Sequence, residues 1–159
     1  MAKKATGNQV EREAVKRYLQ QYYMAKQKKR ILEERHRVLS AELRGPTTAP
    51  AFRTMPTAKP VHPDGAGAVV FQIAEVEERI QKQQTEMARA VQNVMDLIDL
   101  LPIGSMERTV VEMRHIDGKR WEQIAKAVYL SRTAVFNYYN SALAMLLENE
   151  RTKDFVGEF

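Results

Sequence analysis

The chain has 159 residues, a net charge of +5 at pH 7 and no cysteine. This length allows one compact domain or two very small ones, and a hydrophobic content of 44% excludes a fully disordered chain. The lack of cysteine excludes disulfides, thiolate metal sites and cysteine nucleophiles. Because the three histidines (His36, His62 and His115) are scattered in sequence, we expect no metal site and no cofactor.

Neither a membrane span nor a secretory signal is expected from the sequence. No apolar run approaches the roughly 20 residues that cross a bilayer. The N-terminal stretch MAKKATGNQV has two lysines but no apolar segment behind them. We therefore expect a cytoplasmic protein without a membrane partner.

The basic charge is concentrated in the N-terminal segment, where residues 1–45 carry 12 basic and 5 acidic side chains. The absence of proline and glycine from about residue 10 to residue 44 predicts one long helix. Apolar side chains between Tyr18 and Leu43 follow a spacing of three and four residues, interrupted at Lys29 and His36, which predicts an amphipathic or coiled-coil helix. Its basic side chains form either a solvated face or a contact with nucleic-acid phosphates or an acidic protein.

Residues 46–69 differ in composition, since this stretch holds five of the six prolines. Proline fixes φ and removes a backbone donor, so we expect a flexible linker with a solvated His62. Residues 70–101 then contain neither glycine nor proline. Apolar side chains recur from Ile73 to Leu101 with one polar position at Gln83, which predicts a long heptad helix. Either the N-terminal helix, as a hairpin, or a second copy of the chain must cover its apolar seam. We expect a homodimer through residues 70–101.

Three shorter helices are predicted after Pro102-Ile103-Gly104, which ends the heptad helix. In chain order they run from Met106 to about Ile116 with Ser105 as N-cap, from about Arg120 to Val128 after the Asp117-Gly118 turn, and from Arg132 to about Leu147 with Ser131 as N-cap. The polar tail, residues 148–159, is predicted to fray.

Two short helices joined by a tight turn, with a serine cap on the second, are typical of a helix-turn-helix. Its expected core comprises Trp121, Ile124, Ala125, Val128 and Val135. The outer face of the second helix is predicted to contact DNA bases through Arg132, Thr133, Phe136, Asn137 and Asn140, because Arg and Asn read guanine and adenine edges. The predicted phosphate contacts are Lys119, Arg120, Lys126 and Ser131. A helical hairpin that only packs a core would show the same apolar spacing.

Residues 100–146 resemble region 4 of the sigma-70 family. The matching positions, in order, are Leu101-Pro102, Arg108, Val111, Arg114, Asp117-Gly118, Glu122, Ile124, Ala125, Ser131-Arg132, Val135 and Ala142-Leu143. Region 4 contacts the −35 promoter element and the RNA polymerase flap, so the resemblance implies base contacts by Arg132, Thr133, Phe136 and Asn137. The overall layout is similar to small phage-encoded regulators of Gram-positive bacteria, the RinA-like and ArpU-like activators.

The chain departs from the sigma-70 pattern in three ways. Tyr129 stands where sigma factors favour glycine, so the turn must be built differently or accept strain. The last helix carries less charge than a sigma recognition helix, so the preferred DNA sequence should differ. Nothing upstream resembles sigma region 2, so we do not expect this protein to open promoters by itself.

The sequence thus predicts an all-α protein with long amphipathic or coiled-coil helices and a C-terminal region 4-like helix-turn-helix bundle. The expected parts are a basic N-terminal helix (1–45), a linker (46–69), a heptad helix (70–101), a DNA-binding domain (102–147) and a tail (148–159). We expect a transcriptional regulator, an activator, that binds double-stranded promoter DNA and has RNA polymerase as a further candidate partner. The alternative is an adaptor that binds RNA polymerase or a sigma factor without reading bases. No catalytic constellation is present, so we do not expect an enzyme.

Overall fold

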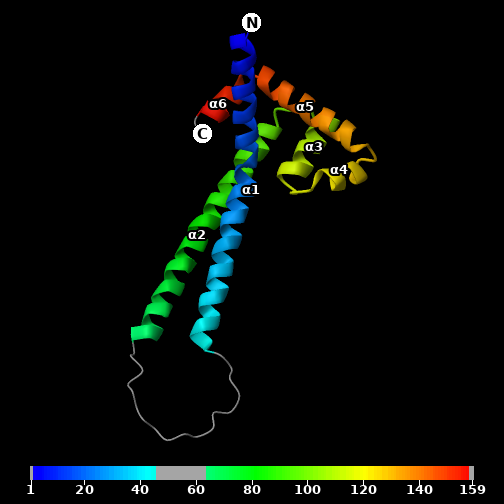
Figure 1. Ribbon diagram of the computed structural model, residues 1–159. Coiled ribbons are helices and arrows are strands. Elements are labelled where there is room, and N and C mark those ends of the chain that lie inside the picture. The colour runs from blue at the N-terminus through cyan, green and yellow to red at the C-terminus, as the bar shows by residue number, and fades with distance from the viewer. Residues whose placement is uncertain (1, 46–63, 158–159) are drawn as a thin grey trace, which may run out of the picture. The chain divides into compact units, whose positions relative to one another are not determined.

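The computed structural model describes residues 2–45 and 64–157, and side chains within 7–45 and 67–157. The described residues form six helices and no strand, which confirms the all-α class. The helices are α1 (Ala2–Arg44), α2 (Asp64–Ile98), α3 (Met106–His115), α4 (Trp121–Ala127), α5 (Arg132–Glu148) and α6 (Arg151–Gly157), as Figure 1 shows. His62 and most of the predicted linker lie outside the described residues.

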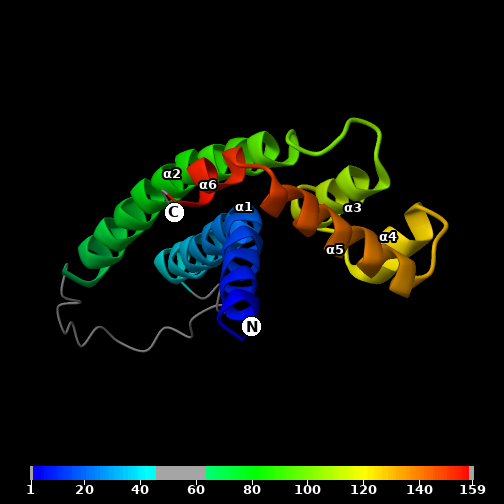
Figure 2. The same ribbon diagram turned by 90° about the horizontal axis from the view of Figure 1, so that it is seen from above.

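The chain divides into two compact units, and α1 and α2 each contribute to both. The core unit comprises Met1–Lys26 and Glu86–Phe159, and the paired-helix unit comprises Gln27–Thr85. In the core unit, α3, α4 and α5 pack on one another (Figure 2). Only the core unit contains the three short helices that the sequence resemblance concerns.

One apolar core holds the core unit together, and it includes the first part of α1. Its buried members are Val15, Tyr18, Leu19, Val94, Leu97, Ile98, Leu101, Val110, Val111, Ile124, Val135, Tyr139, Ala142, Leu143 and Leu146. On α5 these residues recur every three or four positions, the spacing that places side chains on one helix face. The N-terminal helix therefore helps to form the core of the C-terminal helices, which the sequence analysis did not predict.

The helix boundaries differ from the prediction at the starts of both long helices. α1 begins at Ala2 rather than near residue 10, and α2 begins at Asp64 rather than Val70. Residues 64–69, predicted as linker, are therefore helical. The last proline of the run is Pro63, and glycine within a helix costs only about 1 kcal/mol relative to alanine, so the two glycines at 65 and 67 are tolerated.

The C-terminal tail also folds further than predicted, because residues 151–157 form α6. Asn149 Oδ1 accepts a hydrogen bond from the Arg151 backbone N–H at 3.0 Å and so satisfies one free donor of this helix. Thr152 is buried and its hydroxyl donates to the Leu146 carbonyl. The Phe155 ring lies edge-on to Tyr18 of α1, with 6.3 Å between centroids. These contacts fix the segment that was expected to fray.

In the paired-helix unit, the second part of α1 and the first part of α2 lie side by side (Figure 1). His36 Nε2 is 2.9 Å from Glu77 Oε1, one contact between the two helices. The seam residues Ile73, Val76 and Ile80 of α2 are half-buried. The apolar seam of α2 was expected to be covered either by the N-terminal helix or by a second copy of the chain. In the structure, α1 of the same chain lies along it as a hairpin.

The connection between α4 and α5 is closed by backbone hydrogen bonds and one strained residue. The Leu130 N–H donates to the Ala125 carbonyl at 3.0 Å, and Val128 N–H donates to Ile124 at 3.0 Å. Tyr129 has φ +56°, in the left-handed region that L-residues avoid, and its side chain is 94% exposed. The turn is therefore strained at the position where the resembled family favours glycine.

Replacing Tyr129 with glycine should therefore stabilise the protein. The left-handed conformation costs a non-glycine residue about 1–2 kcal/mol, and glycine loses part of this gain to its greater freedom in the unfolded chain. We expect Tyr129→Gly to raise the free energy of unfolding by up to about 1 kcal/mol, measured by urea denaturation. Lys126→Gly, within α4, is the matched control and should lower it by about 1 kcal/mol. A loss of stability in both variants would contradict the strained turn.

Candidate nucleic-acid interface

The first turn of α5 is set by a serine cap. Ser131 has extended backbone angles, φ −71° and ψ 155°, and its Oγ accepts a hydrogen bond from the Ala134 N–H at 3.1 Å. Val135 and Tyr139 turn into the core, with exposed fractions of 0% and 7%. The opposite side of this turn carries exposed side chains. The cap and the buried face together fix which residues α5 presents to solvent.

Four of the five predicted base-contacting residues are exposed, namely Arg132, Thr133, Asn137 and Asn140. Phe136 is only half-buried, because its ring packs on Trp121 with 4.4 Å between centroids. The Arg132 guanidinium carbon lies 5.8 Å from the centroid of the Phe136 ring. This cation–π contact limits the freedom of the arginine without burying it.

Asn140 is engaged from another helix. Its Oδ1 accepts a hydrogen bond from Arg12 Nη2 on α1. This contact could not be predicted from the sequence, because the two residues are separated by 128 positions and neither belongs to a local motif. Arg132, Thr133 and Asn137 form the exposed face that remains, and we call these three residues the reading face.

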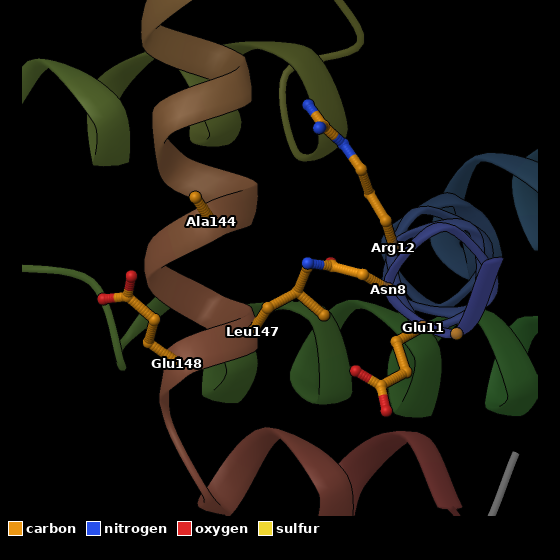
Figure 3. Close-up of a pocket in the computed structure, with 7 residues that line it drawn as sticks. Asn8, Glu11, Arg12, Ala144, Leu147 and Glu148 are labelled. Carbon is orange, nitrogen blue, oxygen red and sulfur yellow. The ribbon is translucent and has the colours of Figure 1, made fainter. Parts of the chain in front are cut away.

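A cleft lies beside Arg12, between α1 and α5, with a volume of about 620 Å³ (Figure 3). It is lined by Gly7, Asn8, Glu11, Arg12, Ala144, Leu147 and Glu148. Two of these residues carry carboxylates and only one carries a positive charge. A phosphate would be repelled by the carboxylates, so this cleft does not supply a phosphate site.

The predicted phosphate contacts divide into free and engaged side chains. Arg120 and Lys126 are exposed, and no ion pair among the described residues includes either of them. Lys119 Nζ lies 3.7 Å from Asp117 Oδ2, and the hydroxyl of Ser131 accepts the cap hydrogen bond. Of the predicted phosphate contacts, Arg120 and Lys126 are therefore the cations that no acidic side chain engages among the described residues.

The predicted apolar residues between α4 and α5 are in place. Ile124 and Val135 are fully buried, whereas Trp121, Ala125 and Val128 are half-buried and pack against the core. Trp121 also contacts Tyr139 edge-on at 5.0 Å between centroids. The Arg114 guanidinium on α3 lies over the indole ring of Trp121, 4.7 Å from its centroid. The indole thus joins α3, α4 and α5.

A buried histidine supports α5 from α3. His115 is 6% exposed, and its Nε2 is 3.0 Å from the Tyr139 hydroxyl. Burial lowers the pKa of His115 to about 4, with a smaller contribution from Arg114 and an opposing hydrogen bond with the Leu19 backbone. Burial also raises the pKa of Tyr139 to about 12. The pair is therefore neutral at pH 7. The four-residue step from Val111 to His115 places both on one helix face, a signal that sequence reasoning missed.

Comparison of the chain with protein-family models, curated proteins and solved structures found no match. Within the described ranges, no three His, Cys, Asp or Glu side chains gather in a group that could hold a metal ion. No helix in the described part of the chain is both long and apolar enough to cross a membrane.

The buried His115 should make stability depend on pH in a defined window. An unfolded histidine binds a proton near pH 6.5, whereas the folded one does so only near pH 4, so the unfolded state holds more protons between these values. The free energy of unfolding should fall by about 3 kcal/mol more in the wild type than in His115→Gln as the pH drops from 7 to 4. Urea denaturation of both proteins across this range measures the difference. Parallel pH profiles would show that His115 is not held neutral.

Proposed function

We propose that the chain is a sequence-specific DNA-binding transcriptional regulator, with α4 and α5 forming a helix-turn-helix like that of sigma-70 region 4. The observation that carries the proposal is the arrangement of the first two turns of α5. Ser131 caps the helix, Val135 and Tyr139 are buried, and Arg132, Thr133 and Asn137 are exposed. A helix that enters the major groove with its N-terminal turn uses residues at these positions.

The chemistry of the reading face suits base recognition. Arg pairs bidentately with guanine O6 and N7, Asn pairs with adenine N6 and N7, and the Thr methyl suits the methyl group of thymine. The exposed Arg120 and Lys126 would contact phosphates, which position the helix without specifying sequence. The half-buried Phe136 would hold Arg132 by the cation–π contact rather than read a base on its own.

The resemblance to phage activators is the reason for proposing activation as the direction of regulation. A homodimer through residues 70–101 stays a prediction. The packing of these residues within one chain restricts how two copies could pair. Ala90, Val94 and Leu97 of the seam are buried in the core unit, so two copies could use this seam only by displacing or exchanging α1.

Footprinting on DNA that flanks the gene tests the proposal. We expect the wild type to protect a site, and Arg132→Ala/Asn137→Ala to lose that protection, because each bidentate pair contributes about 1–3 kcal/mol. Arg89→Ala/Gln92→Ala, which removes one charge and one amide from the exposed surface of α2, is the matched control and should keep the site. Binding should weaken as salt rises.

Failure to protect any site at low salt would contradict base reading. The same variants would then be assayed against core RNA polymerase. Polymerase binding unaffected by the double substitution would favour the adaptor alternative.

A further inference from the structure

The paired-helix unit has a groove between α1 and α2 with a volume of about 370 Å³. It is lined by Ile31, Leu32 and Gln83 and by four cations, Lys28 and Arg35 from α1 and Arg79 and Lys82 from α2. No acidic residue lines it. The groove thus concentrates positive charge from two helices on one side of the unit.

The cations from α1 have no competing partner, since no ion pair among the described residues includes Lys28 or Arg35. Both are exposed. Arg79 and Lys82 pair with Glu75 and Glu78 on their own helix, at 2.6 and 3.0 Å. These pairs are exposed, and exposed pairs contribute little, so an anion in the groove can compete with the two glutamates.

The opposite face of α1 differs in its charge balance. Arg30 and Arg37 lie there, about 180° around the helix from Lys28 and Arg35 at 100° per residue. Arg37 donates two hydrogen bonds to Glu34, at 2.6 and 3.0 Å, so this face carries an acidic side chain among its cations, whereas no acidic side chain lines the groove. The groove is therefore the more electropositive side of this segment.

We propose that this groove binds the phosphate backbone of double-stranded DNA, as a second contact surface that is independent of base sequence. The proposal rests on the DNA-binding function proposed above and deepens it by assigning a phosphate-binding role to the paired helices. Lys28 and Arg35 are two helical turns apart, or about 10 Å, which spans about three phosphates of one strand along the duplex axis. A membrane surface fits the groove less well than DNA. Binding to a membrane surface needs a broad exposed apolar face, and Ile31 is the one exposed apolar side chain among the residues that line the groove.

Salt dependence measures this role directly. Each neutralised phosphate contributes about −0.9 to the slope of log K against log salt. Lys28→Gln/Arg35→Gln should reduce the magnitude of the slope by about 1.8 for a short duplex of unrelated sequence. Fluorescence anisotropy of the full chain gives the slope, and circular dichroism verifies that the helices are retained.

Arg30→Gln/Arg37→Gln is the matched control, since it removes the same charge at the same spacing from the opposite face of α1. It should change the slope by less than half as much. Equal slopes for the wild type and the groove variant would contradict phosphate binding by the groove. An equal reduction of the slope in the groove variant and the control variant would contradict it as well. Binding of anionic phosphatidylserine vesicles in preference to the duplex, lost in the groove variant, would also overturn it.

Footprinting of the same proteins separates this inference from the proposed function. A retained protected site with an unchanged slope in the groove variant would overturn the groove alone. Duplex binding with a slope that depends on the groove, but without a protected site, would uphold the groove and contradict base reading. The absence of any duplex binding would contradict both.

Discussion

The burial of one face of α5 is the constraint on which the rest of the core unit depends. Val135, Ala142, Leu143 and Leu146 are completely buried, and Tyr139 nearly so. Because side chains on a helix advance by 100° per residue, fixing this face also fixes the face turned to solvent. The exposure of Thr133 and Asn137 is therefore a consequence of core packing. Arg132 has the same angular position as the buried residues and is exposed because it is the first residue of the helix.

This arrangement gives the N-terminal helix a structural part in the candidate interface. Val15, Tyr18 and Leu19 of α1 are in the core that holds α5, and Leu19 also meets the buried His115 through its backbone. Arg12 reaches Asn140 on the exposed side of α5. The two parts of α1 thus have different roles. The first part contributes apolar side chains to the core unit, and the second part carries exposed cations in the paired-helix unit.

Local signals allowed much of the fold to be predicted. Ser105 and Ser131 each accept a hydrogen bond from the third residue of the helix they begin, as serine does at an N-cap. The strain at Tyr129 could be anticipated because only glycine takes a left-handed conformation freely. Apolar spacing likewise placed Ile124 and Val135 in the core, since periodicity along one helix is a property of the sequence alone.

Contacts between distant segments could not be predicted in this way. The Arg12–Asn140 hydrogen bond and the place of Val15 and Leu19 in the core depend on tertiary packing, which a helical repeat does not encode. The same repeat on α2 fits a hairpin or a dimer equally well. α6 was missed because its order comes from Thr152 and Phe155 packing on other helices, rather than from its own short polar sequence.

The proposed function requires α5 to read bases with the exposed side chains of its first two turns. Selection of binding sites from a randomised duplex library, with the wild type and Asn137→Ala compared, tests it most directly. We expect a defined preferred site for the wild type, and a preference relaxed at one base-pair position for the variant, at a cost of about 1–3 kcal/mol. No preferred site, or an unchanged preference in the variant, would contradict it.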